Sequence, residues 1–153
     1  MTAAHCVVDE TGEIVDRPYF IDGHPAIVFE VNVADDLALL QTTDWGVKTG
    51  LKLANRAPRQ GELVENMGFS WGQAHPFYYL GYVASTEYED FIFAGMVAIG
   101  GQSGSPIVNS DGKVVGVCHV RWGGGPFSDF SPLLGFTQYE TLKAYDRGWV
   151  FER

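Results

Sequence analysis

Short segments in which apolar and polar residues alternate are the dominant pattern of this 153-residue chain. Residues 25–33 (PAIVFEVNV) alternate with the period of two that a half-buried β-strand requires. Residues 37–42 (LALLQT) follow a tight Asp35–Asp36 step and predict a second, more buried strand. Nineteen glycines interrupt the chain between such segments, so we expect an all-β barrel or sandwich of many short strands.

The same pattern predicts five further strands, at residues 61–69, 77–85, 91–99, 106–109 and 113–120. The last two flank residues 110–112 (SDG), a turn signal at the point where a β-hairpin needs one. The helix signal is confined to residues 138–147, where Tyr139, Leu142 and Tyr145 recur at three-residue spacing on one face. The length of the chain is that of one domain.

The composition argues against two classes of partner. The formal net charge is −9, and no cluster of Lys and Arg is present to displace counterions from phosphates, so nucleic acid is not expected as a partner. No run of about eighteen apolar residues occurs, so the sequence predicts no membrane-spanning helix. Two cysteines, Cys6 and Cys118, are too few for a disulfide framework.

Three short segments carry residue types that suit nucleophilic chemistry, and they are residues 2–6 (TAAHC), 36–40 (DLALL) and 100–106 (GGQSGSP). A serine hydroxyl is a weak nucleophile until an imidazole takes its proton, and the imidazole needs a carboxylate to fix its tautomer. The chain offers one of each, in the order His5, Asp36 and Ser103. The surrounding glycines let the backbone turn sharply, so the N–H groups of Gly101 and Ser103 can aim at one point as an oxyanion hole.

These segments resemble, in order and spacing, the catalytic motifs of trypsin-like (chymotrypsin-fold) serine peptidases. In that family TAAHC holds the catalytic histidine, an Asp before alternating apolar residues holds the aspartate, and G-x-S-G-[GS]-P holds the nucleophile. Residues 61–69, 81–85 and 110–117 extend the likeness, which is greatest toward bacterial HtrA-type and glutamyl-endopeptidase-like members. The resemblance implies two six-stranded antiparallel β-barrels, with histidine and aspartate from the first barrel and serine from the second.

The sequence also departs from the family pattern. In the family, strands precede the histidine motif, whereas here the motif begins directly after Met1. We therefore expect an incomplete first barrel over residues 1–58, and a second barrel with the C-terminal helix over residues 59–153. The sequence would then be a fragment, or its start would lie inside a longer reading frame. Gln102 stands where digestive enzymes have an aspartate that captures the freed amino terminus, so activation by that cleavage is not expected.

Two residues are expected at the substrate pocket by the same resemblance. Val97 would form the pocket floor, where an apolar side chain disfavours Lys or Arg before the scissile bond. His119 follows residues 115–118 (VGVC) on the strand that lines the pocket in the family. It either contacts the substrate, as in relatives that cut after Glu or Gln, or has a structural role. Residues 123–125 (GGG) are expected at the pocket rim.

Alternatives stay open for the site. Asp35 competes with Asp36, although the apolar alternation after Asp36 places Asp36 at the start of a strand. A zinc site at the adjacent His–Cys pairs, residues 5–6 and 118–119, lacks the usual ligand spacing, so neither a metal nor a cofactor is expected.

The leading hypothesis is a serine endopeptidase that acts on protein or peptide substrates through an acyl-enzyme. One rival is a non-catalytic, protein-binding relative that keeps the fold, or an inactive fragment. An esterase of the α/β-hydrolase fold is disfavoured, because a strand and not a helix is predicted to follow Ser103.

Overall fold

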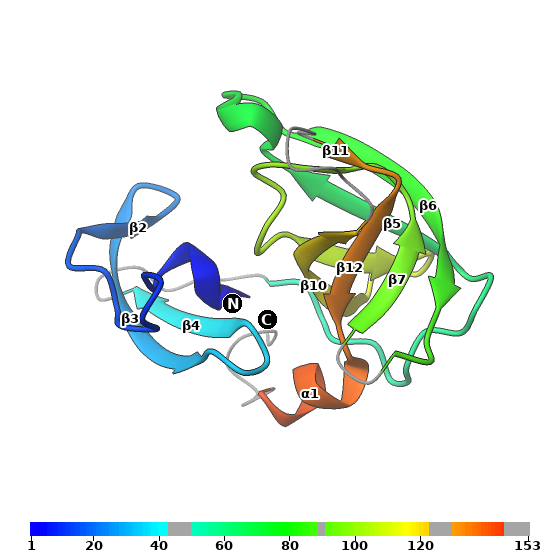
Figure 1. Ribbon diagram of the computed structural model, residues 1–153, viewed down its shortest axis with the longest axis horizontal. Coiled ribbons are helices and arrows are strands. Elements are labelled where there is room, and N and C mark those ends of the chain that lie inside the picture. Colours follow the sequence, from blue (N-terminus) through cyan, green and yellow to red (C-terminus); the bar gives the residue numbers. More distant parts are fainter. Residues whose placement is uncertain (43–49, 89–90, 123–129, 146–153) are drawn as a thin grey trace.

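The computed structural model describes residues 1–42, 50–88, 91–122 and 130–145, whose strands form two main β-structures (Figure 1). One is a sheet of four strands, called the open sheet below, and the other is a closed barrel of six strands, called the closed barrel. Both are antiparallel, and among the described residues one short α-helix follows the barrel. The predicted all-β class, with an incomplete first barrel and a complete second one, is confirmed.

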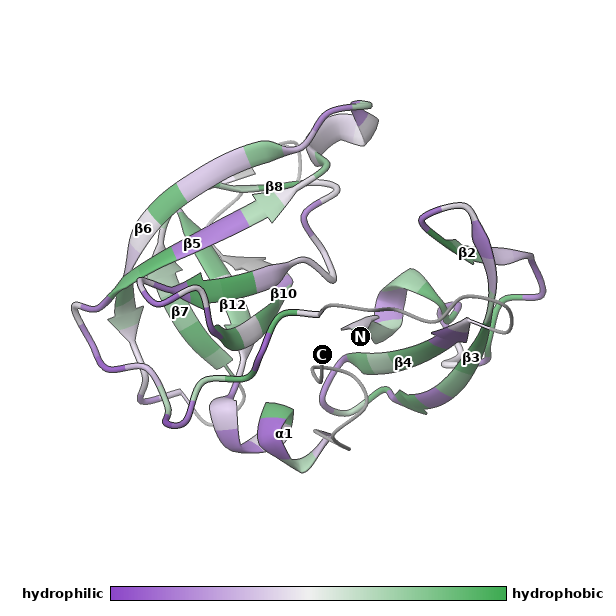
Figure 2. Cartoon of the chain, turned by 180° about the vertical axis from the view of Figure 1, so that it is seen from behind, coloured by the Kyte–Doolittle hydropathy of each residue, from purple (hydrophilic) through white to green (hydrophobic). Residues whose placement is uncertain are grey.

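The open sheet has the strand order β1-β4-β3-β2. Its strands are β1 (Thr2–Ala3), β2 (Tyr19–Ile21), β3 (His24–Asn32) and β4 (Leu37–Thr42). The predicted pair of long strands is present, because β3 and β4 pair from Ala26 opposite Thr42 to Asn32 opposite Leu37. In Figure 2, β4 is coloured mainly as hydrophobic and β3 is mixed, in keeping with the more buried character expected of β4. The 3-10 helix η1 (Ala4–Cys6) follows β1 directly.

The closed barrel has the strand order β10-β12-β7-β6-β5-β9. Its strands are β5 (Leu63–Gly68), β6 (Phe77–Ser85), β7 (Phe91–Gly95), β9 (Pro106–Asn109), β10 (Val114–Trp122) and β12 (Leu133–Thr137). The expected hairpin is confirmed, since β9 pairs with β10 and the Gly112 N–H donates to the Asn109 carbonyl at 2.9 Å. A separate two-stranded sheet joins β8 (Ala98–Ile99) to β11 (Phe130–Ser131).

Some elements differ from the sequence-based expectation. The strand expected at residues 91–99 is split, because β7 ends at Gly95 and β8 begins at Ala98. The helix α1 spans Tyr139–Ala144 and is shorter than predicted, and residues 146–147 of the predicted helix lie outside the described residues. The short strands β1, β2 and β11 and the strand β12 were not predicted. In the described part of the chain, no helix has the length and apolar character needed to cross a membrane.

Two apolar clusters hold these elements together. The first fills the barrel, and every barrel strand contributes to it through Val64, Val83, Ile92, Ala94, Ile107, Val115, Cys118, Leu134 and Phe136. The second joins the two regions, because Leu37 of β4 packs with Val114 and Val117 of β10 and with Leu142 of α1. The helix therefore uses its predicted apolar face to brace the open sheet against the closed barrel.

Candidate active site

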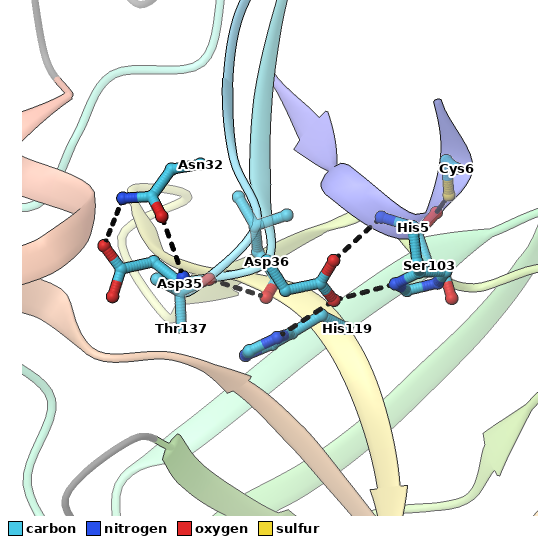
Figure 3. A network of polar contacts seen from close by, with 9 residues as sticks. His5, Cys6, Asn32, Asp35, Asp36, Ser103, His119 and Thr137 are labelled. Carbon is cyan, nitrogen blue, oxygen red and sulfur yellow. Dashed lines mark hydrogen bonds and ion pairs between the residues drawn. The ribbon is translucent and has the colours of Figure 1, made fainter. Parts of the chain in front are cut away.

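His5 and Asp36 lie in contact in the open sheet. His5 is the middle residue of η1 and Asp36 is the last residue before β4, so the pairing of β1 with β4 brings them side by side. Nδ1 of His5 is 2.7 Å from Oδ2 of Asp36. The backbone N–H of His5 donates to Oδ1 at 2.9 Å. One carboxylate therefore holds both the ring and the main chain of His5 (Figure 3).

The tight turn before β4 sends two neighbouring carboxylates in different directions. The Asp36 N–H donates to the Val33 carbonyl at 3.3 Å, and Asp36 has a φ of 49°, in the left-handed region that Asp tolerates. Asp35 accepts a hydrogen bond from the Asn32 side-chain amide at 2.6 Å, and its own N–H donates to Asn32 Oδ1 at 3.1 Å. Of the two carboxylates, it is Asp36 that contacts His5 (Figure 3).

The contact between the two side chains shifts the pKa of each. Hydrogen bonding to Asp36, with the Cys6 thiol as a lesser partner, raises the pKa of His5 to about 10 against the opposing effect of burial. Burial would raise the pKa of Asp36, but hydrogen bonds from His119 and His5 outweigh it and hold that pKa below the ordinary carboxyl value. Asp36 is therefore ionised over the working pH range and favours the imidazolium form of His5.

A second imidazole reaches the same carboxylate. His119 lies on β10, and its Nδ1 is 3.3 Å from Oδ2 of Asp36. Its side chain is only 2% exposed, and its ring packs edge-on against Phe91 with the centroids 4.7 Å apart. Reasoning from the sequence did not foresee this contact, because no local pattern links a barrel strand to the turn that carries Asp36.

Ser103 lies in the loop between β8 and β9, whose shape depends on glycine. Gly101 has a φ of 98°, and a Cβ there would strike a neighbouring backbone carbonyl. The buried Gln102 side chain spans the loop, since Oε1 accepts from the Ile99 N–H at 2.5 Å and Nε2 donates to the Val97 carbonyl at 3.3 Å. Within the described residues, the N–H groups of Gly101 and Ser103 donate to no backbone carbonyl, so both stay available as hydrogen-bond donors.

His5 and Ser103 line one cavity of about 390 Å³. The other lining residues among those described are Ala98, Ile99, Gly100, Gln102, Cys118 and His119. None of these is Asp, Glu, Lys or Arg, so the described wall carries no fixed charge apart from that of His5 when it is protonated. In the described structure, Ser103 Oγ and His5 Nε2 form no hydrogen bond, and such bonds often tighten only when substrate is bound.

The two residues expected in the substrate pocket lie in different settings. Val97 is 42% exposed, and its neighbours Ala98 and Ile99 line the cavity where Val97 was expected to do so. His119 lines the cavity but turns Nδ1 toward Asp36. Residues 123–125, expected at the rim, lie outside the described residues. A contact of Val97 or His119 with a substrate therefore stays a prediction.

The two cysteines are free thiols near this site. Cys118 is buried, and burial raises its pKa to about 12, so it stays protonated and does not compete as a nucleophile. The thiol of Cys6 lies 4.0 Å from the Ser103 carbonyl oxygen and brings η1 of the open sheet against the loop of the closed barrel. Cys6 and Ser103 thus lie at the contact between the two regions.

Comparison with known families agrees with this arrangement. The sequence matches the family described as "Trypsin-like peptidase domain" over residues 1–117, a range that includes His5, Asp36 and Ser103. The chain belongs to this family. A search of curated proteins finds no match.

Solved structures of similar fold extend the comparison. An "HtrA-type protease AlgW with tripeptide" has a TM-score of 0.76 at 18% identity, and the match covers 97% of this chain and 51% of that one. A serine endoprotease from Yersinia pestis has a TM-score of 0.73 at 16% identity, covering 97% of this chain and 52% of that one. At these identities the likeness shows the fold, and the chain spans about half the length of these structures.

Proposed function

We propose that the chain is a serine endopeptidase with a triad of His5, Asp36 and Ser103. One observation carries the proposal: Asp36 holds Nδ1 of His5 at 2.7 Å, while His5 and Ser103 line the same cavity. This leaves Nε2 of His5 as the ring nitrogen that can take a proton from Ser103. A solved HtrA-type protease of similar fold is described with a tripeptide, which supports peptides as the class of ligand.

The proposed reaction has two steps, acylation and deacylation, and in each step His5 takes up one proton and gives it back. His5 Nε2 takes the proton of Ser103 Oγ as that oxygen bonds to the scissile carbonyl carbon, and the N–H groups of Gly101 and Ser103 bind the resulting oxyanion. The peptide C–N bond then breaks as His5 protonates the leaving amine, which gives the acyl-enzyme. Water attacks the acyl carbon, gives its proton to His5, and releases the acid while Ser103 regains its proton. Asp36 stabilises the imidazolium throughout.

Labelling by a fluorophosphonate tests the proposal directly, because the reagent reacts with a serine that a neighbouring base activates. We expect the unmodified chain to be labelled and the Ser103→Ala and His5→Ala variants not to be labelled. Ser110→Ala is the matched control, since Ser110 lies in the exposed turn between β9 and β10 and should leave labelling unchanged. Labelling that persists in Ser103→Ala would refute the assignment of the nucleophile.

The residues that line the cavity also support a preference for the substrate residue before the scissile bond. Ala98 and Ile99 give it an apolar side, and its described lining residues include no carboxylate that would pair with Lys or Arg. We therefore expect cleavage after small or medium apolar residues, or after Glu or Gln if His119 reaches the substrate. A peptide-library digest cut mainly after Lys or Arg would contradict this preference.

The second candidate function is that of a non-catalytic peptide-binding module with the same fold. Two observations favour it: Ser103 Oγ makes no hydrogen bond with His5 in the described structure, and the pKa of His5 is raised to about 10. Such a module would bind peptides in the cavity and would resist fluorophosphonate at every pH. Labelling that appears only at alkaline pH would support the peptidase.

A further inference from the structure

A chain of hydrogen bonds ties the loop that carries Ser103 to strand β5 of the closed barrel. Nδ2 of Asn66 on β5 donates to Oγ of Ser105 at 2.7 Å and to the Pro106 carbonyl at 3.0 Å. Oγ of Ser105 donates in turn to the Gln102 carbonyl, which also accepts from the Ser105 N–H at 2.9 Å. The reaction steps above give Asn66 and Ser105 no role, so a buried polar network beside the nucleophile is left unexplained.

Packing does not explain the burial of Asn66. It is 1% exposed and alternates with the buried Val64 and Gly68 on the side of β5 that faces the barrel core, where an apolar side chain would be the ordinary choice. Its Oδ1 is buried and has no hydrogen-bond partner among the described residues. An unsatisfied buried acceptor lowers stability, so the contribution of Asn66 lies in what its Nδ2 donates to.

The neighbours of Asn66 fix the direction of these hydrogen bonds. The Pro106 carbonyl only accepts, so the amide atom that faces it is Nδ2 and not Oδ1. Ser105 Oγ then accepts from Nδ2 and has its one proton left for the Gln102 carbonyl, which also only accepts. The buried Cys118 thiol also lies beside Ser105, but a thiol is a weaker hydrogen-bond partner than an amide. The donors therefore run in one direction, from Asn66 through Ser105 to the Gln102 carbonyl.

The Gln102 carbonyl and the Ser103 N–H belong to one peptide group. Because that group is planar and trans, its C=O and N–H point in opposite directions, and fixing one of them fixes the other. The Ser103 N–H donates to no backbone carbonyl among the described residues and is one of the two proposed oxyanion donors. The two hydrogen bonds from Ser105 at the carbonyl also polarise the peptide group, which makes its N–H a stronger donor.

We propose that Asn66 and Ser105 are positioning residues that hold the Gln102–Ser103 peptide so that its N–H points at the oxyanion. The proposal rests on the proposed function, because it takes that N–H as an oxyanion donor. In the described structure, neither side chain makes a hydrogen bond or an ion pair with His5. The role is therefore confined to stabilising the oxyanion and does not extend to the base.

Three variants test the positioning role by kinetics on a peptide ester. Ser105→Ala removes the hydroxyl, and Asn66→Leu removes the amide while keeping a side chain of similar size. We expect each to lower kcat about ten- to thirtyfold with KM nearly unchanged, less than the roughly 10²–10³ for losing an oxyanion donor outright. Since the two side chains act through one chain of hydrogen bonds, the double variant should lose little more than either single one.

Tyr139→Phe is the matched control for these variants. It also deletes one buried hydrogen bond of the molecule, from the Tyr139 hydroxyl to the Ala54 carbonyl at 2.7 Å, but Tyr139 is not among the described residues that line the cavity. We expect it to lower stability and to leave kcat unchanged. If Tyr139→Phe lowered kcat as much as Ser105→Ala does, the effect would be general destabilisation and the proposal would be wrong.

A second measurement, by NMR, does not depend on catalysis. Hydrogen bonds at a carbonyl polarise its whole peptide group, so the ¹⁵N chemical shift of the Ser103 amide reports on the Gln102 carbonyl. Asn66→Leu should shift this signal although residue 66 is remote in the sequence, and Ser105→Ala should shift it in the same direction. Tyr139→Phe should leave it in place.

Each result decides the proposal. An unchanged kcat in a folded Ser105→Ala variant overturns it, as do additive losses in the double variant or a rise in KM at constant kcat. If Asn66→Leu does not fold, the kcat and the Ser103 signal of Ser105→Ala decide. If fluorophosphonate never labels the unmodified chain, the proposed function fails, whereas an unmoved Ser103 signal in a folded Asn66→Leu variant refutes only the role of Asn66 and Ser105.

Discussion

The closed barrel and the open sheet bury their apolar residues in different ways. In the barrel, large side chains such as Ile92, Ile107 and Phe136 are almost fully buried, and each strand has a neighbour on both edges. In the open sheet and the residues beside it, four of the seven buried apolar residues are alanine. The seven are Ala3, Ala4, Val7, Ala26, Leu37, Ala38 and Leu39. A cavity of about 330 Å³, lined among others by Val7, Phe20 and Leu40, lies against this sheet. The barrel therefore has the stronger core of the two.

The difference matters because the candidate site takes one part from each region. The open sheet supplies His5 and Asp36, and the closed barrel supplies Ser103. Contacts across the junction hold the parts together, among them the hydrogen bond from Asn32 to the Tyr145 hydroxyl at 2.6 Å. His5 and Asp36 thus depend on contacts with the barrel, because few large apolar side chains are buried in their own sheet.

The largest expected effect tests whether the open sheet supplies an essential group. Asp36→Asn should lower turnover about 10⁴-fold, because the amide holds His5 in the wrong tautomer. Asp35→Asn is the matched control, since Asp35 bonds to Asn32 and should leave turnover within a few-fold of the unmodified chain. Steady-state kinetics on a peptide ester would measure both. If the neighbouring variant were the damaging one, the assignment of the carboxylate would be wrong.

The second-largest expected effect tests whether the apolar cluster between the two regions stabilises the open sheet. Leu142 of α1 is fully buried beside Leu37 and two barrel residues, so Leu142→Ala should cost about 2–5 kcal/mol of unfolding free energy. Leu80→Ala is the control, because Leu80 is 57% exposed and should change stability by about 0.5 kcal/mol or less. Urea unfolding followed by circular dichroism would measure both changes. An unaltered midpoint in Leu142→Ala would show that the cluster does not join the regions.

Much of the fold and of the candidate site could be predicted from the sequence, because these features depend on local patterns. The hairpin at residues 110–112 has its turn signal between two apolar strands, and β4 has an uninterrupted apolar run. His5, Asp36 and Ser103 were singled out because each lies in a short motif. The fold class and the long strands followed from the same kind of signal.

Other features could not be predicted, because they depend on contacts between distant parts of the chain. β12 is a short strand whose place is fixed by closure of the barrel between β7 and β10. The contact between His119 and Asp36 joins the two regions and has no sequence period. The split between β7 and β8 also depends on tertiary pairing, since β8 pairs with β11 and not with a barrel strand.

A smaller effect concerns pH, because His5 must be neutral to act as a base. With its pKa raised to about 10, we expect kcat/KM to rise about tenfold per pH unit between roughly pH 7 and 9. The pH profile of ester hydrolysis would measure this rise. Asp35→Asn should leave the profile unchanged, and a plateau reached near neutral pH would contradict the strong pull of Asp36 on His5.

The same shift in the pKa of His5 gives stability the opposite trend. A folded-state pKa of about 10 against an ordinary value of 6.5 means that the folded protein binds the His5 proton more tightly than the unfolded chain does. This contribution is fully present below about pH 6.5 and is lost as the pH rises through about 10. Activity should therefore increase over a range in which the open sheet becomes less stable.

The smallest expected effect is a difference in local opening between two pairs of antiparallel strands, one from each region. β3 with β4 and β5 with β6 are both antiparallel pairs, but the first lies in the open sheet and the second in the closed barrel. Amides of β3 and β4 should exchange with solvent more than about tenfold faster, and their exchange should depend weakly on added urea, because a local opening exposes little surface. Amides of β5 and β6 should exchange only through global unfolding, with the full urea dependence. Hydrogen exchange read by NMR would measure both. Equal rates and equal urea slopes would mean that the open sheet and the closed barrel unfold as one unit, with the junction strong enough to erase the difference between their cores.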